Sequence, residues 1–163
     1  MSGVAIAFRT YDRIRADFER SLPLVTPGSR ILVADDYANQ PDEMAPPKEL
    51  ACLAMIERSS LVSIAYANPH KQVLVVKPQY RASTGAYNDD PIPLPLLLNP
   101  HAFDPVRQPV AFAPSGRFYW ANWVSDYDYV YVMNRANQPS PAPERLELTF
   151  DGDRFQLFRV RHP

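Results

Sequence analysis

The sequence predicts one compact, soluble α/β domain with a mixed sheet, and three observations lead to that prediction. An amphipathic stripe near the amino terminus is typical of a helix packed on a sheet, and short apolar runs bounded by turn residues follow it. Two alternating segments around an Asp-Gly turn predict a carboxyl-terminal antiparallel hairpin. The length of 163 residues, 46% of them hydrophobic, fits a single core over residues 1–163.

The first helix is predicted over residues 5–22, because apolar side chains recur there at steps of three and four. These side chains are Val4, Phe8, Tyr11, Ile14, Phe18 and Leu22. Proline and glycine at 23–29 end the helix, and the apolar run that follows at 30–35 is typical of a buried strand. A helix that leads into a central strand is therefore expected.

The middle of the chain combines short regular elements with a proline-rich stretch. A second helix is predicted near 48–58, with strands near 61–66 and 72–77. Residues 78–117 have little periodicity, and we expect them to form a long arm that wraps the domain, with a functional lid as the alternative. The leucines at 94–98 are the candidate for an exposed apolar patch.

The last third of the chain is strongly β-prone. Residues 127–133 alternate tyrosine and valine and predict a strand. A hairpin is expected over residues 145–161, because two alternating segments, 145–150 and 154–161, flank the turn Asp151-Gly152-Asp153. We expect it at the antiparallel edge of the sheet, with one face exposed to solvent.

The charge balance and cysteine content exclude several function classes. With 17 basic and 18 acidic residues, the chain lacks the positive field that nucleic acids or anionic membrane surfaces require. Cys52 is the only cysteine, so an internal disulfide is excluded, and its apolar surroundings favour a core residue. No segment is long and apolar enough for a membrane span, and we expect no metal and no cofactor.

Asp35 and Asp36 follow the first buried strand, and they are the best-placed candidates for chemistry. Open α/β sheets bind ligands outside the carboxyl ends of their strands. Paired carboxylates at that position can hold a divalent cation or divide the roles of acid and base, and capping of the next turn is the alternative interpretation. These two residues are weak catalytic candidates.

The weak candidates for ligand binding lie in the aromatic segment and the last strand. Asp126 and Asp128 match an Asp-x-Asp metal signature, and Trp120 and Trp123 are candidates to stack on a sugar or a base. Arg159 belongs to a basic cluster that can meet a phosphate or a carboxylate. The alternatives are turn capping, core packing and a solvated edge strand.

Three segments of the sequence together resemble a known protein family. They are residues 22–34, with Leu22-Pro23 and Arg30-Ile31-Leu32-Val33-Ala34, then residues 49–58, and then Tyr127-Asp128-Tyr129-Val130-Tyr131-Val132. They resemble the carboxyl-terminal soluble α/β domain of bacterial multi-spanning, glycosyltransferase-like membrane proteins. The resemblance covers about residues 11–160 and implies a tail domain. It carries no catalytic residue to this chain, because the acids of that class lie on membrane-side loops.

We therefore expect a non-catalytic accessory or interaction domain, with a protein partner or the membrane-embedded remainder of a larger protein. The alternatives are a small sugar-nucleotide- or metal-binding enzyme that uses Asp35 and Asp36, and a structural subunit of a larger complex. A tail domain would lie on the extracytoplasmic face of the inner membrane, and a chain complete as written would lie in the cytoplasm.

Overall fold

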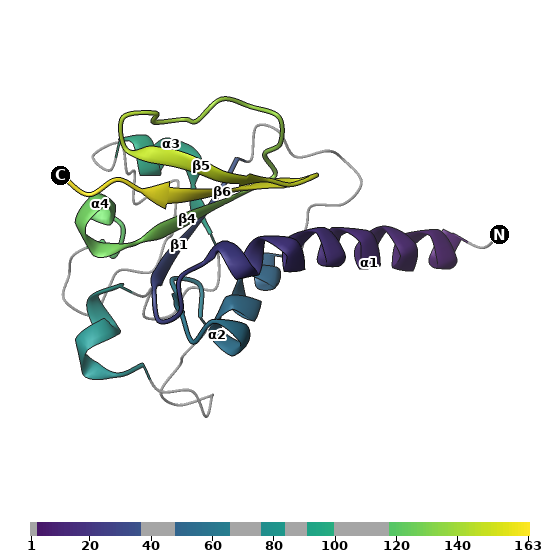
Figure 1. The fold of residues 1–163 in the computed structure, drawn as a ribbon, viewed down its shortest axis with the longest axis horizontal. Helices are drawn as coiled ribbons and strands as arrows, with labels where there is room; N and C mark the ends of the chain where they lie inside the picture. Colours follow the sequence, from purple (N-terminus) through teal and green to yellow (C-terminus); the bar gives the residue numbers. More distant parts are fainter. Residues whose placement is uncertain (1–2, 37–47, 66–75, 84–90, 100–117) are drawn as a thin grey trace, which may run out of the picture.

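Six strands form one mixed sheet in the part of the chain that the structure describes (Figure 1). The computed structural model describes residues 3–36, 48–65, 76–83, 91–99 and 118–163. The predicted class, an α/β fold with a mixed sheet and a carboxyl-terminal hairpin, is confirmed. Most of the strand expected at 72–77 lies outside the described residues, and residues 76–77 are not in a strand.

The sheet is parallel around its first strand and antiparallel at the other side. Its strands run in the order β2-β1-β4-β6-β5, and β3 also pairs with β1. β1 is parallel to β2, β3 and β4, whereas β6 is antiparallel to both β4 and β5. The bounds are β1 Arg30–Asp35, β2 Leu61–Val62, β3 Ile92–Pro93, β4 Tyr129–Met133, β5 Leu146–Asp151 and β6 Phe155–Val160.

Both faces of the central strands are buried, so the fold has three layers. Side chains alternate along β1, where Ile31 and Val33 join one apolar cluster while Leu32 and Ala34 join the other. A strand buried on both faces requires an apolar run without polar interruptions, and residues 31–34 supply that run.

The first face is covered by α1 (Gly3–Ser21) and by the α2 region. Ile14, Phe18 and Leu22 are buried against this face, which confirms the predicted stripe. The amino-terminal part of α1 extends past the sheet (Figure 1), and Tyr11 on the same stripe is 40% exposed. No described helix is both long and apolar enough to cross a bilayer.

The second predicted helix is split into two types of turn. Residues 48–52 form the 3-10 helix η3 (Lys48–Cys52), and only Leu53–Glu57 form the α-helix α2. Leu50, Ala51 and Ala54 pack into the same cluster as α1. The prediction of helical structure over residues 48–58 is therefore correct in its location. The first half is a 3-10 helix and not the expected α-helix.

The second face is covered by α3 (Leu94–Leu98) and α4 (Trp123–Asp126). The arm predicted at 78–117 contains η4 (Pro78–Ser83), β3 and α3, so its described parts are not structureless. The predicted exposed patch at 94–98 is wrong, because three of its four leucines are buried against this face and only Leu98 is exposed, at 48%.

The carboxyl-terminal hairpin is confirmed, but its exposure differs from the prediction. β5 is the edge strand and has exposed residues, whereas β6 lies between β4 and β5 and is buried on both faces except at Arg159. The polar residue Gln156 in β6 is fully buried, and its amide nitrogen donates to the Gln138 carbonyl at 2.8 Å. The alternation of polar residues in this strand therefore does not mark a wet face.

Side-chain hydrogen bonds fix α1 to the sheet. The Asp17 carboxylate accepts a hydrogen bond from the backbone N–H of Asp153 at 2.7 Å, and it pairs with Arg20. The hydroxyls of Ser21 and Tyr131 are 2.8 Å apart in the core. These contacts join the carboxyl-terminal half of α1 to the hairpin turn and to β4, so that half is the fixed part of the helix.

Candidate functional site

The two predicted acids meet a second polar pair at the carboxyl ends of β1 and β4. Because these strands are parallel neighbours, they end at the same edge of the sheet. Asn134 donates from Nδ2 to Oδ1 of Asp35 at 2.8 Å, and Arg135 donates from Nη1 to Oδ2 of Asp36 at 2.8 Å. We call Asp35, Asp36, Asn134 and Arg135 the carboxyl-edge cluster.

All four residues of the carboxyl-edge cluster are buried, with whole-residue exposures between 6% and 8%. Burial raises the pKa of Asp35, the hydrogen bond from Asn134 lowers it, and the nearby charge of Asp36 raises it, with a net increase. Within the described residues, Oδ1 of Asn134 and Nε of Arg135 have no hydrogen-bond partner. Both atoms are inaccessible, so an ordered water would satisfy them only from inside the protein.

These hydrogen bonds hold the ends of β1 and β4 together, and the arrangement favours this structural role over the binding of a cation. Arg135 places its positive charge on Asp36, which opposes the binding of a second cation there. Within the described ranges, no group of three or more His, Cys, Asp or Glu side chains can hold a metal ion. Because its pKa is raised, Asp35 holds its proton up to a higher pH than an exposed aspartate does.

The structure does not bring Asp126 and Asp128 to this cluster. Asp128 lies at the opposite edge, where its backbone N–H donates to the Arg30 carbonyl at 2.8 Å and its carboxylate accepts from the Arg30 N–H at 2.7 Å. The six residues of β1 separate the two edges by about 16 Å. Asp126 belongs to α4. A joint site of Asp35 or Asp36 with these two residues is therefore not assembled.

Asp128 and Arg159, both predicted as ligand-binding candidates, line one hollow at the amino ends of β1 and β4. It has a volume of about 680 Å³ and is bounded by the 26–29 loop, β5 and the end of β6. We call it the amino-edge hollow. Tyr129 also lines it, and its hydroxyl contacts Thr26 Oγ1 at 3.0 Å.

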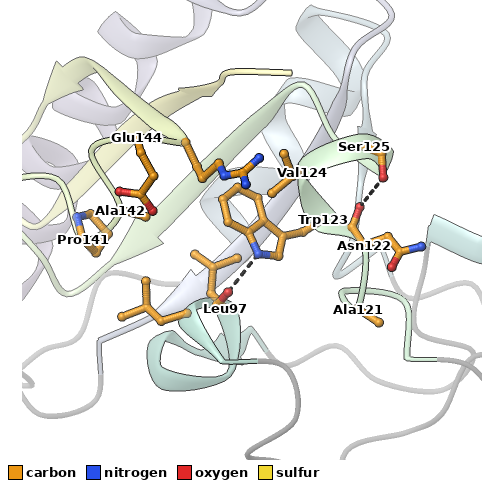
Figure 2. Close-up of a pocket in the computed structure, with 11 residues that line it drawn as sticks. Leu97, Ala121, Asn122, Trp123, Val124, Ser125, Pro141, Ala142 and Glu144 are labelled. Carbon is orange, nitrogen blue, oxygen red and sulfur yellow. Dashed lines mark hydrogen bonds between the residues drawn. The ribbon is translucent and has the colours of Figure 1, made fainter. Parts of the chain in front are cut away.

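The two predicted stacking residues, Trp120 and Trp123, lie in the core cluster of the second face. Trp120 is fully buried, so its ring is not available to a ligand at the surface. Trp123 is 6% exposed and lines a second pocket of about 600 Å³ (Figure 2). In that pocket its indole N–H donates to the Leu97 carbonyl at 2.8 Å. Figure 2 also places Pro141, Ala142 and Glu144 around it. Both tryptophans therefore pack in the core on the second face of the sheet.

Cys52 lies at the edge of the core and not inside it as predicted. It packs, partly buried, against the cluster under α1, and burial together with the Glu49 charge raises the pKa of its thiol. A raised pKa keeps the thiol protonated, which disfavours nucleophilic chemistry.

Sequence reasoning missed Asn134 and Arg135. They directly follow a predicted strand, as Asp35 and Asp36 follow theirs, but the sequence gives no sign that the two strands are parallel neighbours. Asn134 also adopts a left-handed backbone conformation, with φ of 58°, which asparagine tolerates better than most residues.

Compared with protein-family models, with curated proteins and with solved structures, the chain gives no match.

Proposed function

We propose that the chain is a non-catalytic interaction domain that attaches to its partner through the amino-terminal half of α1. One observation carries the proposal: α1 extends past the sheet (Figure 1), and its apolar stripe is already exposed at Tyr11. Ile14 is 2% exposed, whereas Tyr11, one turn earlier on the same stripe, is 40% exposed. The sequence continues the stripe toward the amino terminus with Phe8 and Val4.

The partner that we propose is the membrane-embedded component of an envelope glycosyltransferase-like system, or the membrane-embedded remainder of the same protein. The resemblance of residues 22–34, 49–58 and 127–132 to the tail domains of such proteins supports this choice. Residues 9–15 carry three arginines and one aspartate beside the apolar stripe, and of these Arg13 pairs with Asp153 and Arg15 with Glu19. An amphipathic helix whose amino-terminal part has more arginines than acids suits a membrane boundary.

Membrane fractionation with a matched pair of variants tests the proposal. The tagged 163-residue chain is expressed in the source cells, and membranes are separated from the supernatant. We expect the unchanged chain and Leu148→Asp in the membrane fraction and Tyr11→Asp in the supernatant. Leu148 is a fair control because it is 43% exposed, against 40% for Tyr11, and lies on the edge strand β5.

Three results would contradict the proposal. The first is recovery of the unchanged chain in the supernatant, and the second is the same distribution for both variants. The third is that the purified chain floats with protein-free vesicles of anionic lipid as strongly as with membranes from the source cells. That result would mean that the chain binds lipid and not a membrane protein. Circular dichroism of both variants shows whether each is folded.

A small enzyme built on Asp35 and Asp36 is the second candidate. The position of both residues at the carboxyl edge of the parallel strands favours it, because ligands bind there in open α/β sheets. The ion pair of Asp36 with Arg135 argues against a metal-dependent form of it. A rise in melting temperature with Mg²⁺ or Mn²⁺ that Asp35→Asn abolishes would support this candidate over the interaction domain.

A further inference from the structure

Two arginines and two carboxylates line the amino-edge hollow, and a third arginine, Arg30, lies beside one of these carboxylates. The charged and titratable groups that line it are Asp128, Glu147, Arg159, Arg161 and His162. Its volume of about 680 Å³ lies within the usual range for small-molecule sites. Residues 26–29 also line the hollow.

Both carboxylates in the hollow already have cationic neighbours. Asp128 lies 3.9 Å from Nε of Arg30 and 3.7 Å from Nε2 of His162. Glu147 lies 3.6 Å from Nε of Arg161. Within the described residues, the side chain of Arg159 makes no ion pair or hydrogen bond, although it lines the same hollow. Among the described residues, the Arg159 guanidinium is therefore not held in an ion pair.

The strand pairing explains why these groups converge. Arg159 on β6 is directly opposite Tyr129 on β4 and Glu147 on β5. Arg161 is two residues further along the chain, so the strand period predicts the same side for it, about 7 Å away. His162 is positioned by a 2.8 Å hydrogen bond between its Nδ1 and the Val124 carbonyl.

We propose that the amino-edge hollow binds the phosphate group of a small phosphate monoester, with Arg159 as the main contact and Arg161 and His162 beside it. A guanidinium donates two parallel hydrogen bonds to a phosphate. A phosphate dianion has three acceptor oxygens and up to two negative charges, whereas a carboxylate has two oxygens and one charge, so two neighbouring arginines favour the phosphate. The site lies at the far edge of the sheet from the carboxyl-edge cluster, and it does not depend on the proposed attachment through α1.

Titrations of the ¹⁵N-labelled chain with methyl phosphate, and with acetate at the same ionic strength, test this site. We expect methyl phosphate to shift the backbone amide signals of residues 26–29 and 159–162 and to bind more tightly than acetate. Arg159→Gln should weaken binding by about tenfold, as expected for loss of a charged hydrogen bond. Glu147→Gln should tighten binding by roughly twofold to fivefold, because it removes the competing carboxylate beside both arginines.

Arg145→Gln is the matched control, because Arg145 is an exposed arginine that lines the pocket of Figure 2 and not this hollow. It should leave the affinity unchanged. Equal affinity of the unchanged chain and Arg159→Gln would overturn the proposal, as would equal weakening by Arg145→Gln. Acetate binding as tightly as methyl phosphate would also overturn it. An amide spectrum that matches the unchanged chain outside the hollow shows that a variant is folded.

Discussion

Replacement of Arg135 by methionine should cost the protein a large part of its stability. The guanidinium donates to Asp36 at 2.8 Å and to the Pro139 carbonyl at 2.7 Å, and both side chains of the ion pair are about nine-tenths buried. The removal of one member of a buried ion pair costs about 3–5 kcal/mol, because the other charge stays in the interior. For a chain of this length, about 3 kcal/mol corresponds to a fall in melting temperature of roughly 6–12 °C.

Urea unfolding followed by circular dichroism measures this cost, with two further variants as references. Arg145→Met changes an exposed arginine and should alter the free energy of unfolding by less than about 0.5 kcal/mol. The double variant Asp36→Leu with Arg135→Met should recover much of the loss, since an apolar pair often replaces a buried ion pair without cost. A loss below about 1 kcal/mol for Arg135→Met, or a double variant no more stable than the single one, would refute the reasoning.

Three further predictions concern single side chains. A Cβ added at Gly152 would overlap the Phe155 ring, so Gly152→Ala should lower the free energy of unfolding by about 1–3 kcal/mol through overpacking. An unchanged urea midpoint would contradict the close approach of this turn to Phe155. Tyr131→Phe removes the hydroxyl that contacts Ser21 and should cost about 1 kcal/mol in the same assay, and a gain in stability would contradict that contact. The raised pKa of Asp35 means that the folded chain binds more protons than the unfolded chain, so this group contributes stability below its ordinary pKa of about 4. That contribution is lost as the pH rises through the raised pKa. In a plot of the urea midpoint against pH, Asp35→Asn should therefore flatten this region.

The elements predicted best from the sequence are those with a local signal. The stripe through Ile14 and Phe18 required only helical periodicity, and β1 required only an apolar run between turns. The hairpin around Gly152 required only alternation and a turn dipeptide. Each of these patterns is complete within about 20 consecutive residues, so no knowledge of the tertiary pairing was needed.

The features that the sequence did not predict depend on which strands become neighbours. β6 is buried on both faces because it lies between β4 and β5, and this position puts Gln156 in the core. Asn134 and Arg135 join Asp35 and Asp36 only because β1 and β4 pair across about one hundred residues of sequence. Side-chain type and spacing do not encode that pairing.

The Asp-x-Asp triplet has a structural role at its second aspartate. The Asp128 carboxylate accepts the first N–H of β1, and its backbone N–H donates to the same residue, so Asp128 joins the amino ends of β1 and β4. The same carboxylate lies within 4 Å of His162 in the amino-edge hollow. A three-letter signature did not distinguish this strand contact from a metal ligand.

The central claim is that the amino-terminal half of α1 contacts a membrane-embedded partner, and site-specific photocrosslinking in the source cells tests it most directly. The photoreactive amino acid p-benzoylphenylalanine replaces Tyr11 in one version of the chain and Leu148 in another, and the adducts are identified by mass spectrometry. We expect an adduct with an integral membrane protein from position 11 and none from position 148. No adduct at position 11, or the same adduct from both positions, would contradict attachment through α1.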